Sequence, residues 1–82
     1  MILKANIETN FFIIRIYDRI YHVDHLHSWD ERVAKSYIEI AEKLISKHLS
    51  RDPWALLIDL RKWELSTPAA ENILKNHYYL GV

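Results

Sequence analysis

The sequence predicts a small α/β domain with the element order ββαβα, in which a mixed three-stranded sheet packs against two helices. Three segments lead to this prediction: a β-branched and aromatic run at Phe11–Tyr17, an amphipathic run at Trp29–Leu49, and an apolar run at Trp54–Leu60. Because the chain has 82 residues, we expect a single domain over residues 1–82 with a small core.

The first part of the chain is expected to form a β-hairpin. Ile2–Ile7 alternates weakly between apolar and polar residues, and Glu8–Asn10 supplies residues typical of a turn. Phe11–Tyr17 is the strongest strand pattern in the chain. We interpret the mixed segment Asp18–His27 as a strand end and a loop. One face of the second strand would be apolar and face the core: Phe12, Ile14 and Ile16.

A long helix is expected over Trp29–Leu49. Ser28 and Glu31 have the spacing of a capping box, which would satisfy free N–H groups at the start of the helix. Apolar residues then recur every three or four positions, as on one face of a helix. Pro53 prevents the helix from continuing.

The segment after this helix predicts a strand and a second helix. Trp54–Leu60 lies between a proline and charged residues, which is typical of a buried central strand in a partly parallel sheet. Thr67 is a good N-cap and Pro68 suits the first helical position. We therefore expect a helix from Pro68 to about Leu80, closed by Gly81, and a helical crossover that makes the last two strands parallel.

The apolar strand creates a difficulty in a sheet of three strands. It would lie at an edge, with a row of unpaired N–H and C=O groups and little charge to protect it. Either a second copy of the chain pairs there, or the chain is a fragment of a longer domain. The small core and the net charge of zero favour self-association, so we expect a homo-oligomer, in particular a dimer.

Composition disfavours several functional classes. The net charge of zero argues against a nucleic-acid partner, since such proteins usually carry a basic surplus. The chain has no cysteine and one glycine, so it offers no thiolate nucleophile and no Gly-rich phosphate loop. The N-terminus lacks the pattern of a signal peptide and the apolar runs are too short to span a bilayer. We expect a cytoplasmic protein without a membrane partner.

Four residues around the end of the apolar strand are candidate binding residues. Asp59 could accept backbone N–H groups of the following loop or face a ligand. Trp63 follows in that loop, where it is expected either to be the most exposed tryptophan, a feature of partner surfaces, or to fold back as a lid on the core. Ser66 and Thr67 lie at a helix start, where they could cap the helix or, if phosphorylated, be stabilised by it.

The segment His22–His27, with Asp30 close behind it, contains the ligand types that zinc prefers. In an extended conformation His25 and His27 would share one face, and His22 and Asp24 the other. We expect no metal here, although a wrapped loop could hold one.

The stretch Pro53–Pro68, with the leading hairpin and the long helix, resembles the first half of a STAS domain. This is the fold of anti-sigma-factor antagonists and of the cytoplasmic tails of sulphate transporters. The stretch is also similar to small bacterial STAS-like or Sec14-like proteins. The resemblance implies a regulatory domain that binds a partner kinase and is switched at a serine in an Asp-Ser-Ser-Gly-like turn. The matching stretch here, Leu65–Pro68, contains Ser66 but neither the Asp nor the Gly.

These observations predict a non-catalytic regulatory or protein-binding module of STAS-like type, without enzymatic activity or cofactor. It would act through the surface at the end of the apolar strand and the start of the second helix. Two alternatives stay open: a module that binds a small apolar or anionic ligand at the same place, and a metal-dependent enzyme built on the loop His22–Asp30. The expected binding residues are Asp59, Trp63, Ser66 and Thr67.

Overall fold

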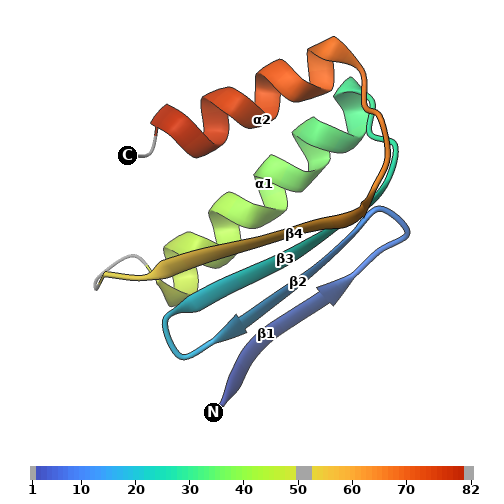
Figure 1. Cartoon of the computed structure of the whole chain (residues 1–82). Coiled ribbons are helices and arrows are strands. Elements are labelled where there is room, and N and C mark those ends of the chain that lie inside the picture. The colour runs from blue at the N-terminus through green and yellow to red at the C-terminus, as the bar shows by residue number, and fades with distance from the viewer. Residues whose placement is uncertain (1, 50–52, 81–82) are drawn as a thin grey trace.

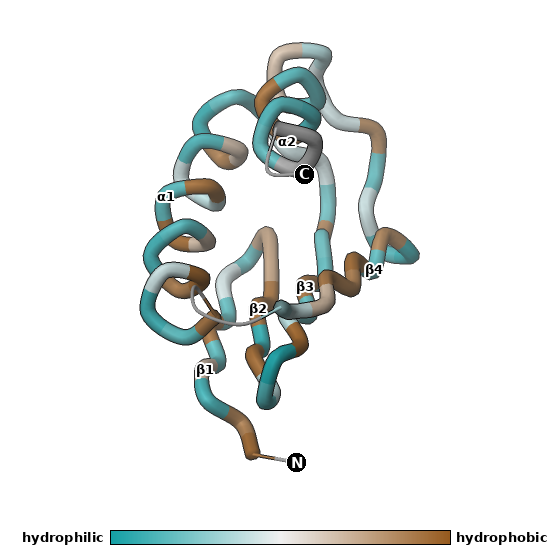
Figure 2. Tube along the Cα trace, turned by 90° about the vertical axis from the view of Figure 1, so that its left-hand side faces the viewer, coloured by the Kyte–Doolittle hydropathy of each residue, from teal (hydrophilic) through white to brown (hydrophobic). Residues whose placement is uncertain are grey.

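The computed structural model describes residues 2–49 and 53–80, and Gly81, expected to end the second helix, lies outside them. Four strands and two helices follow one another along the chain. They are β1 (Leu3–Glu8), β2 (Phe12–Tyr17), β3 (Ile20–His27), α1 (Glu31–His48), β4 (Ala55–Trp63) and α2 (Pro68–Leu80). Both helices lie on the same side of the sheet (Figures 1 and 2). The predicted mixed α/β fold is therefore confirmed, with four strands in place of three.

The strands form one sheet in the order β1-β2-β3-β4. The pairs β1–β2 and β2–β3 are antiparallel and joined by short turns, whereas β3 and β4 are parallel and joined through α1. At the first turn the Thr9 hydroxyl oxygen accepts hydrogen bonds from the N–H groups of Phe11 and Phe12, both at 3.1 Å. The predicted hairpin and the parallel crossover are thus both present.

The extra strand is β3, and the prediction of a loop over Asp18–His27 was wrong. Side chains of β3 alternate between the two faces of the sheet, and Tyr21, Val23 and His25 are buried. The inward His25 conceals this alternation in the sequence, because histidine counts as a polar residue. It is nevertheless only 1% exposed.

The core lies between the sheet and the helices. Phe12, Ile14 and Ile16 of β2 are buried, which confirms the predicted inward face. The hydroxyl groups of Tyr21 on β3 and Tyr37 on α1 lie 2.7 Å apart and share a hydrogen bond inside this core. The helix residues buried with them are Ala34, Tyr37 and Ala41 of α1, and Ala70 and Leu74 of α2.

The two helix starts were predicted with different success. Asp30, not Ser28, caps α1, because its carboxylate accepts the N–H of Val33 at 3.0 Å. The prediction of a capping box at Ser28 was therefore wrong. Thr67 caps α2 as predicted, since its hydroxyl accepts the N–H of Ala70 at 3.2 Å. Neither α1 nor α2, as far as the chain is described, has the length and apolar character needed to cross a bilayer.

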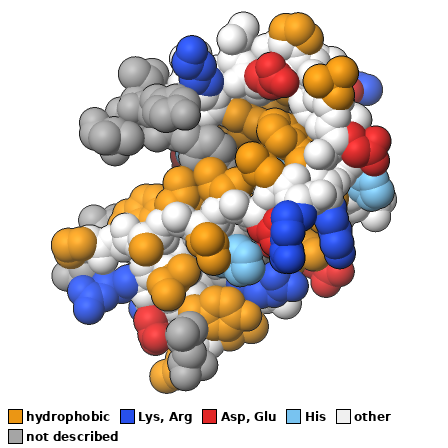
Figure 3. Space-filling model, viewed as in Figure 1, with side chains coloured by type: hydrophobic (Ala, Val, Ile, Leu, Met, Phe, Trp, Pro, Cys, Tyr) orange, Lys and Arg blue, Asp and Glu red, His pale blue; other side chains and the backbone are white. Residues whose placement is uncertain are grey.

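The apolar strand β4 is an edge of the sheet and is not buried. Among the described residues, β4 pairs with β3 on one side and with no strand on the other. For the chain taken alone, the prediction that this segment is a buried central strand was therefore wrong. In Figure 3 hydrophobic side chains run along the β4 side of the molecule into a hollow between β4 and α2. The exposed large residues of this segment are Trp54 (38%), Leu56 (41%), Leu57 (54%) and Leu60 (48%).

This burial pattern makes a first testable prediction. Ile14→Ala should destabilise the protein by about 2–5 kcal/mol, since it removes a fully buried side chain and leaves a cavity. Leu57→Ala, on β4, should cost below about 1 kcal/mol in dilute protein because its side chain is half exposed. Urea unfolding monitored by tryptophan fluorescence measures both. Equal losses for the two variants would contradict the position of β4.

Candidate functional site

The candidate site is the outer edge of β4 together with the start of α2, and we call its exposed apolar side chains the β4 surface. Leu56 is in register with the buried Tyr21, so it points to the helix side of the sheet. Leu57 is in register with His22 and points to the open side. Leu65, just before α2, is 89% exposed. The β4 surface consists of Trp54, Leu56, Leu57, Leu60 and Leu65.

The backbone of β4 adds hydrogen-bonding groups to this surface. The N–H of Ala55 donates to the carbonyl oxygen of Arg19 at 2.8 Å, so Ala55 bonds inward to the neighbouring chain segment. Successive residues of a strand turn their N–H and C=O groups to opposite sides. The N–H and C=O groups of Leu56 and Ile58 therefore point outward, where the described chain offers no further strand.

Asp59 lies on β4 and faces the open side of the sheet, in register with Asp24. It holds Arg61, whose backbone N–H donates to Oδ1 at 3.0 Å and whose Nη2 donates to Oδ2 at 2.7 Å. These hydrogen bonds from Arg61 lower the pKa of Asp59 to about 2. Asp59 thus accepts a backbone N–H, as in one of the two expectations for it, but the donor Arg61 lies in β4 and not in a loop.

Trp63 is the last residue of β4 and not part of a loop. Its half-buried ring meets His25 edge-on at 5.0 Å and Trp29 at 5.8 Å between ring centroids. Its Nε1 is buried and has no acceptor among the described residues. Trp54 is the more exposed tryptophan, so the expectation of an exposed Trp63 was wrong, and the alternative in which Trp63 folds back on the core is the one found.

Ser66 and Thr67 fasten the start of α2 to the segment before α1. Ser66 is 8% exposed, and its hydroxyl oxygen accepts the backbone N–H of Trp29 at 3.0 Å. The N–H of Thr67 donates to the carbonyl oxygen of Trp29 at 3.1 Å. Both residues therefore have structural hydrogen bonds, and the Ser66 hydroxyl faces the interior rather than solvent.

Trp29 is the residue that sequence reasoning placed wrongly, since it precedes α1 and does not belong to its apolar face. Its indole Nε1 lies 3.0 Å from the carbonyl oxygens of both Phe11 and Leu26. Its ring stacks on His25 at 4.2 Å with an interplanar angle of 11°. Trp29 thus joins the β1–β2 turn, β3 and the start of α2.

The buried histidine at this junction is kept neutral near physiological pH. Burial lowers the pKa of His25 to about 4, and the nearby charge of Asp24 opposes this shift only in part. The ring of Tyr37 lies edge-on to it at 5.4 Å. His25 is therefore an aromatic component of the core under these conditions.

A group of possible metal ligands lies on the open face of the sheet. One ligand atom each from His22, Asp24 and Asp59 falls within 4.8 Å of the others. This imidazole–carboxylate set has the donor types of a zinc site. However, Arg15 contacts Asp24 at 3.5 Å and Arg61 binds Asp59, so both carboxylates already have a cationic partner. A bound cation would compete with the guanidinium groups of Arg15 and Arg61 for these carboxylates.

This group differs from the ligand set considered for a loop over His22–Asp30. His25 points into the core, while His22 and Asp24 lie on the opposite face, as the predicted alternation requires. His27, at the end of β3, is 3.8 Å from Glu64. The structure therefore does not bring His25 and His27 together with a carboxylate on one accessible face.

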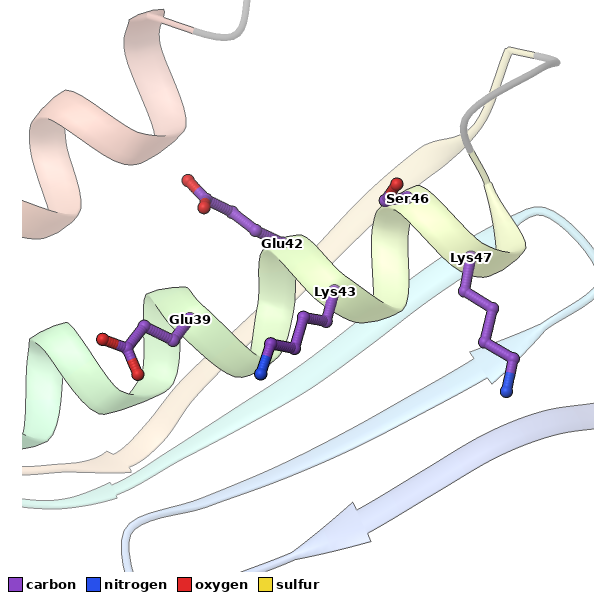
Figure 4. A pocket seen from close by; sticks show the side chains of 5 residues that line it. All are labelled: Glu39, Glu42, Lys43, Ser46 and Lys47. Atoms are coloured by element: carbon purple, nitrogen blue, oxygen red, sulfur yellow. The ribbon is translucent and has the colours of Figure 1, made fainter.

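A shallow hollow on α1 has no features of a site. Figure 4 shows that its five lining side chains come from the same helix and spread in different directions instead of converging. They include both acidic and basic groups on the solvent side of the helix. The lining residues are Glu39, Glu42, Lys43, Ser46 and Lys47.

Comparisons with known proteins return no match. No protein-family model, no curated protein and no solved structure matches the chain. Any statement about function therefore depends on the geometry of the β4 surface and the residues around it.

The bond between Ser66 and Trp29 generates a second prediction. Ser66→Ala should lower the free energy of unfolding by roughly 1–3 kcal/mol, because it leaves the buried N–H of Trp29 without its acceptor. Ser36→Ala, on the exposed side of α1, is the matched control and should change stability by less than about 0.5 kcal/mol. Thermal and urea unfolding would test this, and a Ser66 variant as stable as the control would contradict it.

The burial of His25 generates a third prediction. Between pH 6.5 and 4 the unfolded chain binds a proton on this histidine and the folded chain does not. Stability should therefore fall as the pH is lowered through this range, by up to roughly 3 kcal/mol. The pKa of His77 is lowered by burial too and adds an effect of the same sign.

The comparison that isolates His25 is urea unfolding of wild type and His25→Phe at pH 7, 5.5 and 4. Phenylalanine keeps an aromatic ring against Trp29 but cannot be protonated. The variant should lose most of the pH dependence. An identical pH dependence in both proteins would show that His25 is not the responsible group.

Proposed function

We propose that this chain is a non-catalytic protein-binding module of STAS-like type, which binds an extended segment of a partner along the outer edge of β4. One observation carries the proposal: β4 combines an edge without a described neighbour with large exposed apolar side chains on both of its faces. An exposed apolar edge strand of this kind is a template for pairing with another chain.

The chemistry of the edge indicates what it would bind. Addition of a strand satisfies the outward N–H and C=O groups, and side chains of the added strand alternate between the two faces of the sheet. Leu56 offers an apolar contact on the helix side, Leu57 offers one on the open side, and the exposed Leu60 adds apolar surface at the end of the regular stretch. The partner segment is therefore an extended stretch with apolar residues on both faces. Contiguous exposed apolar surface is in general a feature of interaction sites.

The four residues expected at this site have different roles in the proposal. Asp59 and Trp63 belong to the binding strand itself, where Asp59 holds Arg61 and Trp63 anchors the strand end against Trp29. Ser66 and Thr67 set the position of α2 beside the strand. In this proposal Ser66 and Thr67 hold α2 next to the β4 surface and do not contact the partner.

The absence of catalysis in this proposal is supported by how the reactive groups are engaged. The Asp59 carboxylate is held by Arg61 on both oxygens. The Ser66 hydroxyl is buried and accepts a backbone hydrogen bond from Trp29. Neither group is placed as a free base or nucleophile beside an enclosed cavity.

Selection from a displayed library of random extended peptides tests the proposal. Peptides selected on the wild-type chain should bind Leu56→Lys at least about tenfold more weakly, because a charge at this position blocks the apolar contacts of an added strand. Leu3→Lys is the matched control. Its side chain has a similar exposure on the opposite edge strand, 46% against 41% for Leu56, and it should leave binding unchanged.

Hydrogen–deuterium exchange locates the bound peptide. The amides of Leu56 and Ile58 point outward and should exchange quickly in the free chain and slowly in the complex. If the selected peptides protect other amides instead, or bind both lysine variants equally, the β4 edge is not the binding surface.

A further inference from the structure

We infer that the partner bound at the β4 edge is a second copy of this chain, paired antiparallel through β4 about a twofold axis at Leu57. The inference rests on the proposed function and names its partner. Such a pair would join two four-stranded sheets into one continuous sheet of eight strands. The twofold axis would be perpendicular to the sheet, so the helices of both copies would lie on the same side.

The length of regular strand defines where the axis lies. Pro53 has no N–H to donate at one end, and a bulge between Asp59 and Lys62 interrupts the regular pairing at the other. Between these limits the residues in regular register with β3 are Ala55–Asp59. Antiparallel pairing about a twofold axis places one residue opposite its own copy, and the midpoint of this stretch is Leu57.

The backbone groups fit this register. Ala55 bonds inward to Arg19, so the N–H and C=O groups of Leu57 also point inward and those of Leu56 and Ile58 point outward. Leu56 of each copy would then lie opposite Ile58 of the other and exchange both hydrogen bonds with it. Leu57 would face its copy as a non-hydrogen-bonded pair, in which side chains lie closest together.

The side chains are complementary in the same register. On the helix side, Leu56 lies opposite Ile58 of the second copy. At the ends of the pair, the exposed Trp54 lies opposite the exposed Leu60 of the second copy. On the open side, Leu57 packs against Leu57 of the second copy. Every large exposed residue from Trp54 to Leu60 thereby acquires an apolar neighbour.

The position of Asp59 favours the register centred on Leu57 over registers centred on Ile58 or Asp59. Centring the pair on Asp59 would place two carboxylates opposite each other, and centring it on Ile58 would place Leu57 opposite Asp59. With Leu57 at the centre, Asp59 lies opposite the small Ala55 and stays bound to its own Arg61. Opposed like charges destabilise a strand pair, and a net charge of zero leaves little repulsion between whole copies.

The interface would be small. One strand pair with these side chains falls at or below the lower end of the roughly 1,200–2,000 Å² that stable interfaces bury. We therefore expect a dimer that dissociates on dilution within the micromolar range.

The chain has no cysteine, so a single introduced cysteine reports the residue that faces its own copy. The full chain carrying Leu57→Cys is oxidised with oxidised glutathione, which accepts the two electrons and two protons released as the disulfide forms. It should form covalent dimers at least about tenfold faster than Leu3→Cys, a site of similar exposure on β1. Adding Leu56→Lys to Leu57→Cys should abolish this advantage.

Light scattering on a size-exclusion column should show concentration-dependent dimers for wild type and monomers for Leu56→Lys. Circular dichroism of each variant verifies that it is folded. A wild-type chain that is monomeric at all concentrations, or a Leu57→Cys variant no faster than Leu3→Cys, overturns the inference. Faster dimer formation at a cysteine placed at Ile58 or Leu60 overturns the register.

These outcomes separate the inference from the proposed function. If the chain is monomeric but selected peptides still protect the amides of Leu56 and Ile58, the edge binds a different protein and only the inference fails. If neither a second copy nor any peptide protects these amides, both fail.

Discussion

The hydrogen bonds and ring contacts of Trp29 are the constraint on which the rest of the structure depends. Its indole N–H bonds the carbonyl groups of the β1–β2 turn and of β3, its backbone binds Ser66 and Thr67, and its ring stacks on His25. These contacts join segments that are far apart in the sequence. They hold the segment before α1 against the sheet and attach the start of α2 to it.

This attachment has a consequence for β4. The start of α2 is fastened to Trp29, and the buried residues Ala70 and Leu74 lie on the helix that packs against α1. Neither helix therefore covers the side chains of Leu56 and Leu60 completely. The hydrogen bonds at the start of α2 thus hold this helix in a position that leaves Leu56 and Leu60 partly exposed.

Local patterns predicted most of the fold, and contacts between distant residues account for what they missed. The apolar face of β2 and the Thr67–Pro68 helix start were readable because each depends on neighbouring residues. The strand β3 was missed because its inward histidine is buried by stacking on Trp29, a contact made only after folding. For the candidate site, a hydrogen bond from the N–H of Arg61 to Asp59 was one of two alternatives readable from the sequence, because the two residues are close along the chain. The burial of Ser66 instead depends on a partner 37 residues away.

The apolar character of β4 also decides between the ways in which it could be covered. A ligand or helix on the helix side of the sheet would contact Leu56 but leave Leu57 exposed on the other face. A layer on the open face would cover Leu57 and leave Leu56 exposed. A strand added at the edge reaches both faces at once and satisfies the outward backbone groups as well. Edge pairing is therefore the arrangement that accounts for all of the exposed apolar residues of β4.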